Sequence, residues 1–188
     1  MAAAEPIRDK KLLNQIAEYW LKLGNFRNYV LIVFGACTAL RISDLLKLKW
    51  EDVYDEESKD FRSHVTLKEK KTGKKKTVAL NPKAIEALRL YFPRKRGEFI
   101  FISNRGEKAI SRVQAWRVIR AAAEAIRAAG RIACHSLRKT FGYFAWKKGI
   151  MPVILMDIFN HSSFEITRRY LGITQDDRDD VYLNMALF

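Results

Sequence analysis

The chain has 188 residues, of which 48% are hydrophobic, and this length and composition predict one folded domain and exclude a disordered polypeptide. Its net charge of +14 at pH 7 is strongly basic and favours a polyanionic partner, with nucleic acid as the first candidate. A domain with a generic basic surface would carry the same charge, so charge alone does not decide between the two.

The sequence shows no metal-binding or targeting pattern. It contains two cysteines, Cys37 and Cys134, and no Cys-x-x-Cys pair or histidine–cysteine cluster that would predict zinc. Two cysteines do not indicate a disulfide framework, and they fit a reducing cytoplasm. Residues 1–9 lack the apolar core of a signal peptide, and the longest apolar run, residues 29–40, is too short to span a bilayer. We therefore expect a cytoplasmic protein without membrane contact.

Most of the chain shows the apolar spacing of helices. Residues 10–23 repeat apolar side chains at helical intervals, and residues 26–37 are almost wholly apolar, which predicts a central buried helix. In a short third helix, residues 42–48, the leucines are expected to pack inward while Asp44 and Lys47 share another face. Further helices are expected over residues 82–91, 111–129, 135–149 and 152–160, around Tyr170, and from Thr174 onward.

Partial alternation predicts two strands, residues 61–67 and 75–80, joined by a lysine-rich tip with Thr72-Gly73 as the turn. A third short strand is expected at residues 98–102. The lysines have two interpretations: a solvated tip that discourages edge pairing, or a basic finger that enters a DNA groove. The predicted fold class is mixed α+β, mainly α-helical with a small antiparallel β-sheet.

One set of residues suits chemistry on a phosphodiester: Arg41, His135, Arg138, His161 and Tyr170. A guanidinium makes two charge-assisted bonds to a phosphate, and histidine titrates near neutrality. A tyrosine hydroxyl attacks once a base or cationic neighbours activate it. No carboxylate cluster with metal-ligand spacing lies near these residues, so arginine and lysine would neutralise the charge. Each residue alone has an ordinary structural explanation, but the combination favours a site that cuts and rejoins DNA.

The order of these residues resembles the catalytic domain of the tyrosine recombinase, or phage integrase, family across nearly the whole chain. Residues 39–53 resemble the first-arginine motif, with Asp44 at the family's acidic position. Lys71-Thr72-Gly73 resembles the hairpin that carries the catalytic lysine, and His135-Ser136-Leu137-Arg138 resembles the His-x-x-Arg motif. Asn160-His161-Ser162-Ser163 resembles the second-histidine motif, and Tyr170 resembles the nucleophile.

The chain departs from the family pattern at two turns. Glycine usually precedes the second histidine and often stands two residues before the first arginine, where this chain has Asn160 and Ala39. We interpret both as variation in turn geometry, because neither removes a reacting group. The catalytic lysine is assigned to Lys71, although Lys70 and Lys74 lie close enough to take its place.

The resemblance implies a mechanism. Tyr170 attacks the scissile phosphate, forms a 3′-phosphotyrosyl link and frees a 5′-hydroxyl. Arg41, Arg138 and His161 stabilise the transition state. A 5′-hydroxyl from a partner strand then reverses the step, so the implied activity is site-specific DNA recombination or integration, as in mobile elements.

Three further roles follow from the same resemblance. His135 assists proton transfer, Lys71 protonates the leaving oxygen, and Asp44 orients or supports Arg41 and His135. The energy of the phosphodiester is kept in the covalent link, so no metal, nucleotide or other cofactor is implied.

The resemblance also implies a domain organisation and partners. Family members usually carry an N-terminal helical domain that closes a clamp around DNA, and it is missing here. Residues 1–188 are therefore interpreted as a single catalytic domain, either a fragment of a longer integrase or a short member like the fimbrial-switch invertases. The start at residues 10–23 favours the fragment. The implied partner is double-stranded DNA, which would place the protein at the nucleoid. The implied assembly is a homotetramer in which residues 174–188 contact a neighbouring protomer. Alternatively, residues 174–188 fold back on their own core.

Three alternatives stay open from the sequence. A type IB topoisomerase uses a similar site to relax supercoils, but the small size and the Tyr170 spacing fit integrases better. The second alternative is a DNA-binding module that has lost catalysis, and the complete set of reacting residues argues against it. A basic RNA-binding domain is the third, and no aromatic stacking signature supports it.

Overall fold

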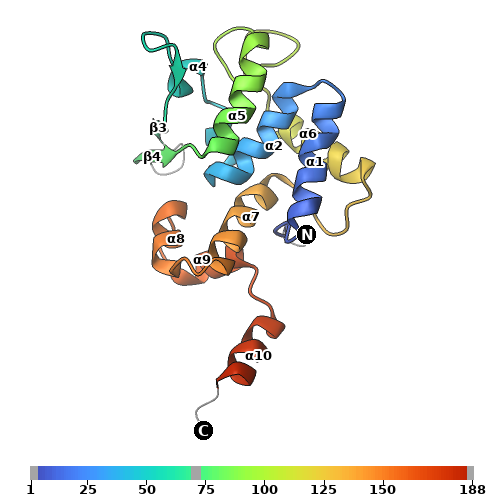
Figure 1. Cartoon of the computed structure of the whole chain (residues 1–188), viewed down its shortest axis with the longest axis vertical. Coiled ribbons are helices and arrows are strands. Elements are labelled where there is room, and N and C mark those ends of the chain that lie inside the picture. The colour runs from blue at the N-terminus through green and yellow to red at the C-terminus, as the bar shows by residue number, and fades with distance from the viewer. Residues whose placement is uncertain (1–3, 69–72, 186–188) are drawn as a thin grey trace.

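The computed structural model of the chain describes residues 4–68 and 73–185. Figure 1 shows a predominantly helical molecule with small β-hairpins and a C-terminal helix that projects from the rest. The longer helices are α1 (Lys10–Lys22), α2 (Phe26–Thr38), α5 (Pro82–Tyr91), α6 (Arg112–Ala125), α7 (Cys134–Lys147), α8 (Pro152–Phe159), α9 (Phe164–Leu171) and α10 (Gln175–Asn184). The short elements are α3 (Ile42–Leu45), α4 (Trp50–Val53), the 3-10 turn η1 (Phe92–Arg94), β1 (Tyr54–Asp55), β2 (Asp60–Phe61), β3 (His64–Lys68) and β4 (Lys75–Ala79).

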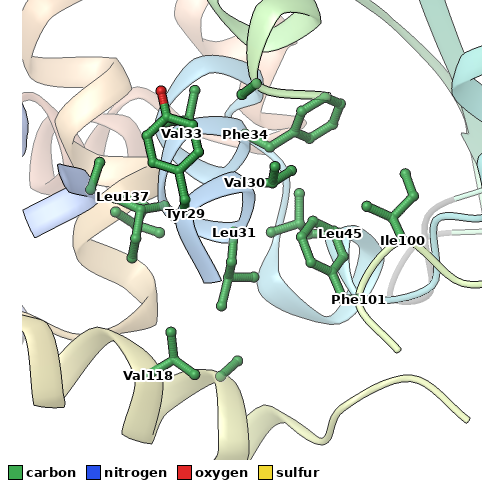
Figure 2. Packing of buried hydrophobic residues seen from close by; sticks show 14 of the residues in the cluster. Tyr29, Val30, Leu31, Val33, Phe34, Leu45, Ile100, Phe101, Val118 and Leu137 are labelled. Carbon is green, nitrogen blue, oxygen red and sulfur yellow. The ribbon is translucent and has the colours of Figure 1, made fainter. Parts of the chain in front are cut away.

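Helix α2 lies at the centre of the hydrophobic core, as its apolar sequence predicted. Val30, Leu31, Ile32 and Phe34 are fully buried, and each such side chain contributes about 1.5–3 kcal/mol. Helices α1, α5 and α7 pack along α2, and Figure 2 shows its side chains meeting residues from the elements around it. This packing fixes the C-terminal end of α2, from which the chain leads directly to residues 39–41.

The strands differ from the prediction in two places. The segment 61–67 is divided, because β2 pairs with β1 in one antiparallel hairpin and β3 pairs with β4 in another. Residues 98–102 do not form a strand, since Phe99 and Ile102 make isolated bridges to segments on either side of them. A two-stranded sheet is marginally stable by itself, so each hairpin depends on contacts with the helices.

The helix expected at residues 42–48 is a single turn, α3. The leucines of this segment are buried as predicted, but Asp44 is buried too, with an exposed fraction of 2%, whereas Lys47 is exposed. The expectation that Asp44 and Lys47 share a face is therefore wrong. The chain leaves the helix after Leu45, so the spacing of a longer helix does not apply.

Helices α7, α8 and α9 form the last part of the body and pack against one another, and α7 also packs on α2. A separate apolar cluster joins them to the end of α2 through Ala39, Leu155, Phe159 and Leu171. This cluster holds the C-terminal ends of α8 and α9 close to the segment that follows α2. No helix in the described part of the chain has both the length and the apolar character needed to cross a membrane.

Candidate active site

The guanidinium groups of Arg41 and Arg138 meet at the C-terminal end of α8. Arg41 Nη2 donates a hydrogen bond to the carbonyl oxygen of Phe159 at 3.3 Å, and Arg138 Nη2 donates to the same oxygen at 2.6 Å. Arg138 Nη1 also donates to the carbonyl oxygen of Ala39. Two residues far apart in the sequence therefore form one cationic pair, held by main-chain oxygens and favoured by the negative end of a helix dipole.

These oxygens belong to two turns with a left-handed backbone conformation. Ala39 has φ 54° and ψ 18°, and Asn160, directly after Phe159, has φ 48° and ψ 56°. This conformation is easiest for glycine, is tolerated by asparagine, and costs alanine about 1–2 kcal/mol. Both residues thus adopt the backbone conformation that glycine favours, and the interpretation of Ala39 and Asn160 as variation in turn geometry stays a prediction.

The ring of Tyr170 lies beside this pair, in the last turn of α9. Its centroid is 4.7 Å from that of His161 and 5.2 Å from that of Phe159. His161 Nδ1 is 3.0 Å from the hydroxyl oxygen of Thr167, a fully buried residue of α9. The Arg138 guanidinium lies 5.8 Å from the Tyr170 centroid. The structure therefore brings Tyr170, His161 and Arg138 together.

His135 lies in the first turn of α7, one turn before Arg138. Its side chain is exposed at the rim of the site, yet desolvation of the covered part of the ring lowers its pKa. The positive charges of Arg138, Lys139 and Arg41 lower this pKa further. The imidazole is therefore neutral at pH 7 and can accept a proton.

Asp44 is linked to Arg41 through the backbone, where its N–H donates to the Arg41 carbonyl oxygen at 2.8 Å. Its side chain lines a cavity of about 290 Å³ together with Thr66 and Leu67 of β3. Asp44 therefore lies beside the half of β3 that is nearer the turn, where Lys68 pairs with Lys75. Asp44 thus lies between the arginine pair and the hairpin that carries the candidate lysines.

Two of the lysines considered for the hairpin tip, Lys70 and Lys71, lie outside the described residues, and Lys74 is exposed just before β4. A fourth lysine, Lys76, was not predicted from the sequence. It lies on the half-buried face of β4, and its Nζ donates to the carbonyl oxygen of Ile158 at 2.5 Å. Strand alternation was the available signal, because a lysine at an inward position requires a partner for its ammonium group.

Comparison with known proteins found a matching family model, relatives and solved structures. Residues 8–176 match the model of the phage integrase family. The probable integrase/recombinase YoeC of Bacillus subtilis is 38% identical over 183 residues, which cover 97% of this chain and 97% of YoeC. The tyrosine recombinase XerA of Pyrococcus furiosus is 28% identical over 153 residues, which cover 79% of this chain and 50% of XerA. The crystal structure of the XerH site-specific recombinase bound to palindromic difH substrate, a post-cleavage complex, matches with a TM-score of 0.77 and 18% identity, covering 98% of this chain and 54% of that chain.

The chain belongs to the phage integrase family of tyrosine recombinases. The likeness to XerH confirms the predicted fold class, a helix-rich α+β domain of the tyrosine recombinase type. The chain spans nearly all of YoeC but about half the length of XerA.

Proposed function

We propose that this recombinase cuts and rejoins double-stranded DNA at a specific site, with Tyr170 as the nucleophile. The observation that carries the proposal is the convergence of Arg41, Arg138, His161 and Tyr170 at the end of α8. The Tn1549 transposon integrase, which has a similar fold, was solved in complex with circular intermediate DNA, and this supports DNA as the partner here. Binding to chromosomal DNA would place this protein at the nucleoid.

In the proposed step, the Tyr170 oxygen attacks the scissile phosphorus in line with the departing 5′-oxygen. A 3′-phosphotyrosyl bond forms as the bond to the 5′-oxygen breaks, so one ester replaces another. The 5′-hydroxyl of a partner strand then attacks the same phosphorus and releases Tyr170. Because the number of ester bonds is unchanged, the exchange requires no energy input from a nucleotide.

The arginine pair is proposed to hold the non-bridging oxygens of the phosphate. A guanidinium carries several N–H donors in a planar fork, and this geometry matches two oxygens of a phosphate. His161 would add a donor from Nε2, because its Nδ1 faces the Thr167 hydroxyl. Arg138 has an exposed fraction of 2%, so DNA binding has to uncover part of its guanidinium.

Two residues are proposed to move protons. His135, kept neutral by its lowered pKa, would assist removal of the Tyr170 proton. Lys71 would protonate the 5′-oxygen as it leaves. Asp44 would support Arg41, to which it is joined by a backbone hydrogen bond.

A nicked oligonucleotide tests the proposal, because the short strand beyond the nick diffuses away after cleavage and leaves the protein trapped on DNA. The oligonucleotide would carry a sequence that the protein itself selects from a random pool. We expect an adduct that survives denaturing electrophoresis, and peptide mapping should place the link on Tyr170. An inactive DNA-binding module predicts no adduct. A topoisomerase predicts plasmid relaxation without site preference and without recombinant product.

Gly142 of α7 is expected to be essential for the position of Tyr170. A Cβ atom at residue 142 would lie 2.9 Å from Phe159 Cζ and 3.1 Å from the carbonyl oxygen of Tyr170. Gly142→Ala should therefore push α9 away and slow adduct formation by about 10- to 100-fold, since a displacement of roughly 1 Å can cost about 100-fold. The rate would be measured in a single turnover on the nicked oligonucleotide.

Gly35→Ala in α2 is the matched control for this variant. Its Cβ would also be too close to a neighbour, at 2.7 Å from Leu137 Cδ1, but it does not adjoin α9. Both variants should lose about 1–3 kcal/mol of stability through overpacking. Equal rates of adduct formation in the two variants would show that Gly142 has no special effect on Tyr170.

Helix α10 is proposed to contact a neighbouring protomer in a homotetramer on two DNA sites. None of its described residues is buried, and exposed fractions are 58% for Val181 and 82% for Leu183. Lys147 Nζ lies 2.5 Å from Asp177 Oδ1, and this ion pair lowers the pKa of Asp177 to about 2. The helix is thus attached to α7 at its base while its apolar part projects away from the body (Figure 1).

A double variant, Val181→Ser with Leu183→Ser, is expected to prevent assembly while sparing the fold. Recombination between two sites should fall by at least about tenfold, because exposed apolar anchors dominate such contacts. Single-protomer DNA binding and the melting temperature should stay unchanged. Light scattering of the DNA complex would measure the assembly, with Asp180→Asn in the same helix as control. A tetramer formed by the double variant would contradict the proposed contact.

A further inference from the structure

Three cationic side chains from three separate elements bind the last two carbonyl groups of α8. Arg41 and Arg138 bind the oxygen of Phe159, and Lys76 of β4 binds the oxygen of Ile158. The C-terminal end of a helix carries a partial negative charge, which favours all three. From this arrangement we infer that Lys76 is a positioning residue, which fixes the β3–β4 hairpin against α8, the helix whose C-terminal end also binds the arginine pair. The inference rests on the proposed function, in which Lys71 at the tip of this hairpin protonates the leaving oxygen.

The register of the hairpin shows that Lys76 is directed inward. It pairs with Leu67 across the sheet and shares its half-buried face with Val78, whereas Lys75 and Thr77 are exposed. A lysine that served only for solubility would occupy one of the exposed positions. Placing an ammonium group on the apolar face has a desolvation cost, which the hydrogen bond to the helix carbonyl offsets.

The space beside Lys76 explains why such a bond matters. A cavity of about 510 Å³ is lined by β4, by Cys37 at the end of α2, by Phe141 of α7 and by Ile158 of α8. Apolar packing between the hairpin and α8 is therefore incomplete at this point. A two-stranded sheet has little rigidity of its own, so a polar bond across the gap adds a second attachment to the packing of β3 on α4.

The test compares Lys76→Met with two variants on two oligonucleotides bearing the same selected site. Methionine keeps the apolar stem of the side chain and removes the donor. One oligonucleotide has the normal 5′-oxygen at the scissile phosphate, and the other has sulfur in its place. A thiolate departs without protonation, so the sulfur substrate does not require the general acid. Lys71→Ala marks complete loss of the proposed acid, and Lys75→Met removes an adjacent charge from the exposed face of β4.

Rates would be measured in single turnovers at saturating protein, which removes any effect of weaker DNA binding. Lys76→Met should cleave the oxygen substrate about 10- to 100-fold more slowly, part of the roughly 100- to 10,000-fold that general acid catalysis supplies. It should cleave the sulfur substrate at nearly the wild-type rate. Lys76→Arg should recover most of the rate on oxygen, and Lys75→Met should match the wild type on both.

Each outcome shows whether Lys76 acts by positioning the hairpin or in another way. Suppose that sulfur rescues Lys71→Ala but that Lys76→Met loses rate equally on both substrates. Lys76 would then act through the arginine pair or the fold, and the inference would be overturned. Unchanged rates on both substrates would overturn it as well. If sulfur fails to rescue Lys71→Ala, the assigned general acid is wrong, and the proposed function loses that step together with the inference.

Discussion

Tyr170→Phe is expected to abolish the covalent DNA adduct while leaving the fold and the DNA affinity nearly unchanged. The phenyl ring keeps its contacts with His161 and Phe159, at centroid distances of 4.7 and 5.2 Å. It also keeps Lys139, whose Nζ is 5.6 Å from the ring centroid. The single change is the loss of the attacking oxygen, so the stability should differ by less than about 1 kcal/mol.

Denaturing electrophoresis after incubation with the nicked oligonucleotide measures this result, and a mobility shift measures binding. Tyr143→Phe is the matched control, because Tyr143 is also half-buried and also lies beside a cation, Arg8, at 5.9 Å. The control should form adduct at the wild-type rate. An adduct formed by Tyr170→Phe would disprove the assignment of the nucleophile.

Arg138→Lys should lower the rate of adduct formation by about 100- to 1,000-fold, the usual effect of losing one preorganised donor at a developing charge. Arg138 donates to two main-chain oxygens, those of Ala39 and Phe159, and is almost completely enclosed. A lysine ammonium is a compact point charge that lacks the planar fork of arginine. Its three donors radiate from one nitrogen and cannot reproduce the two separate nitrogens that bind the oxygens of Ala39 and Phe159, although the positive charge remains.

The same substitution should reduce stability by about 1–3 kcal/mol, since one buried carbonyl loses its hydrogen bond. Thermal unfolding gives this value, and single-turnover cleavage gives the rate. Arg120→Lys is the control, because Arg120 is half-buried and forms an ion pair with Glu124 within α6. A rate for Arg138→Lys within about threefold of the wild type would show that charge alone is sufficient there.

Local signals in the sequence were enough to predict most helices. The Asn81-Pro82 pair placed the start of α5, where the Asn81 side chain accepts a hydrogen bond from the Ala84 N–H. Ser111 caps α6 in the same manner, together with Gln114. Such capping depends on residues within one turn of each other, so it is visible without knowledge of the fold.

The acceptors that hold the arginine pair could not be predicted. The oxygens of Ala39 and Phe159 are main-chain atoms, and every residue carries one, so no side-chain pattern distinguishes them. The burial of Asp44 also depends on long-range packing, because α3 ends early and β3 covers that side. The prediction of a strand at residues 98–102 was wrong for a similar reason, because this segment forms only isolated bridges with Lys49 and Ala109.

The binding of the arginine pair by peptide oxygens has a consequence for how such proteins diverge. The residues at positions 39 and 160 can change, provided that their backbone conformation persists, as φ of 54° and 48° do here without glycine. Identity scores therefore undervalue distant members of the family at these turns. A search on backbone torsions and on the two arginines would recover them.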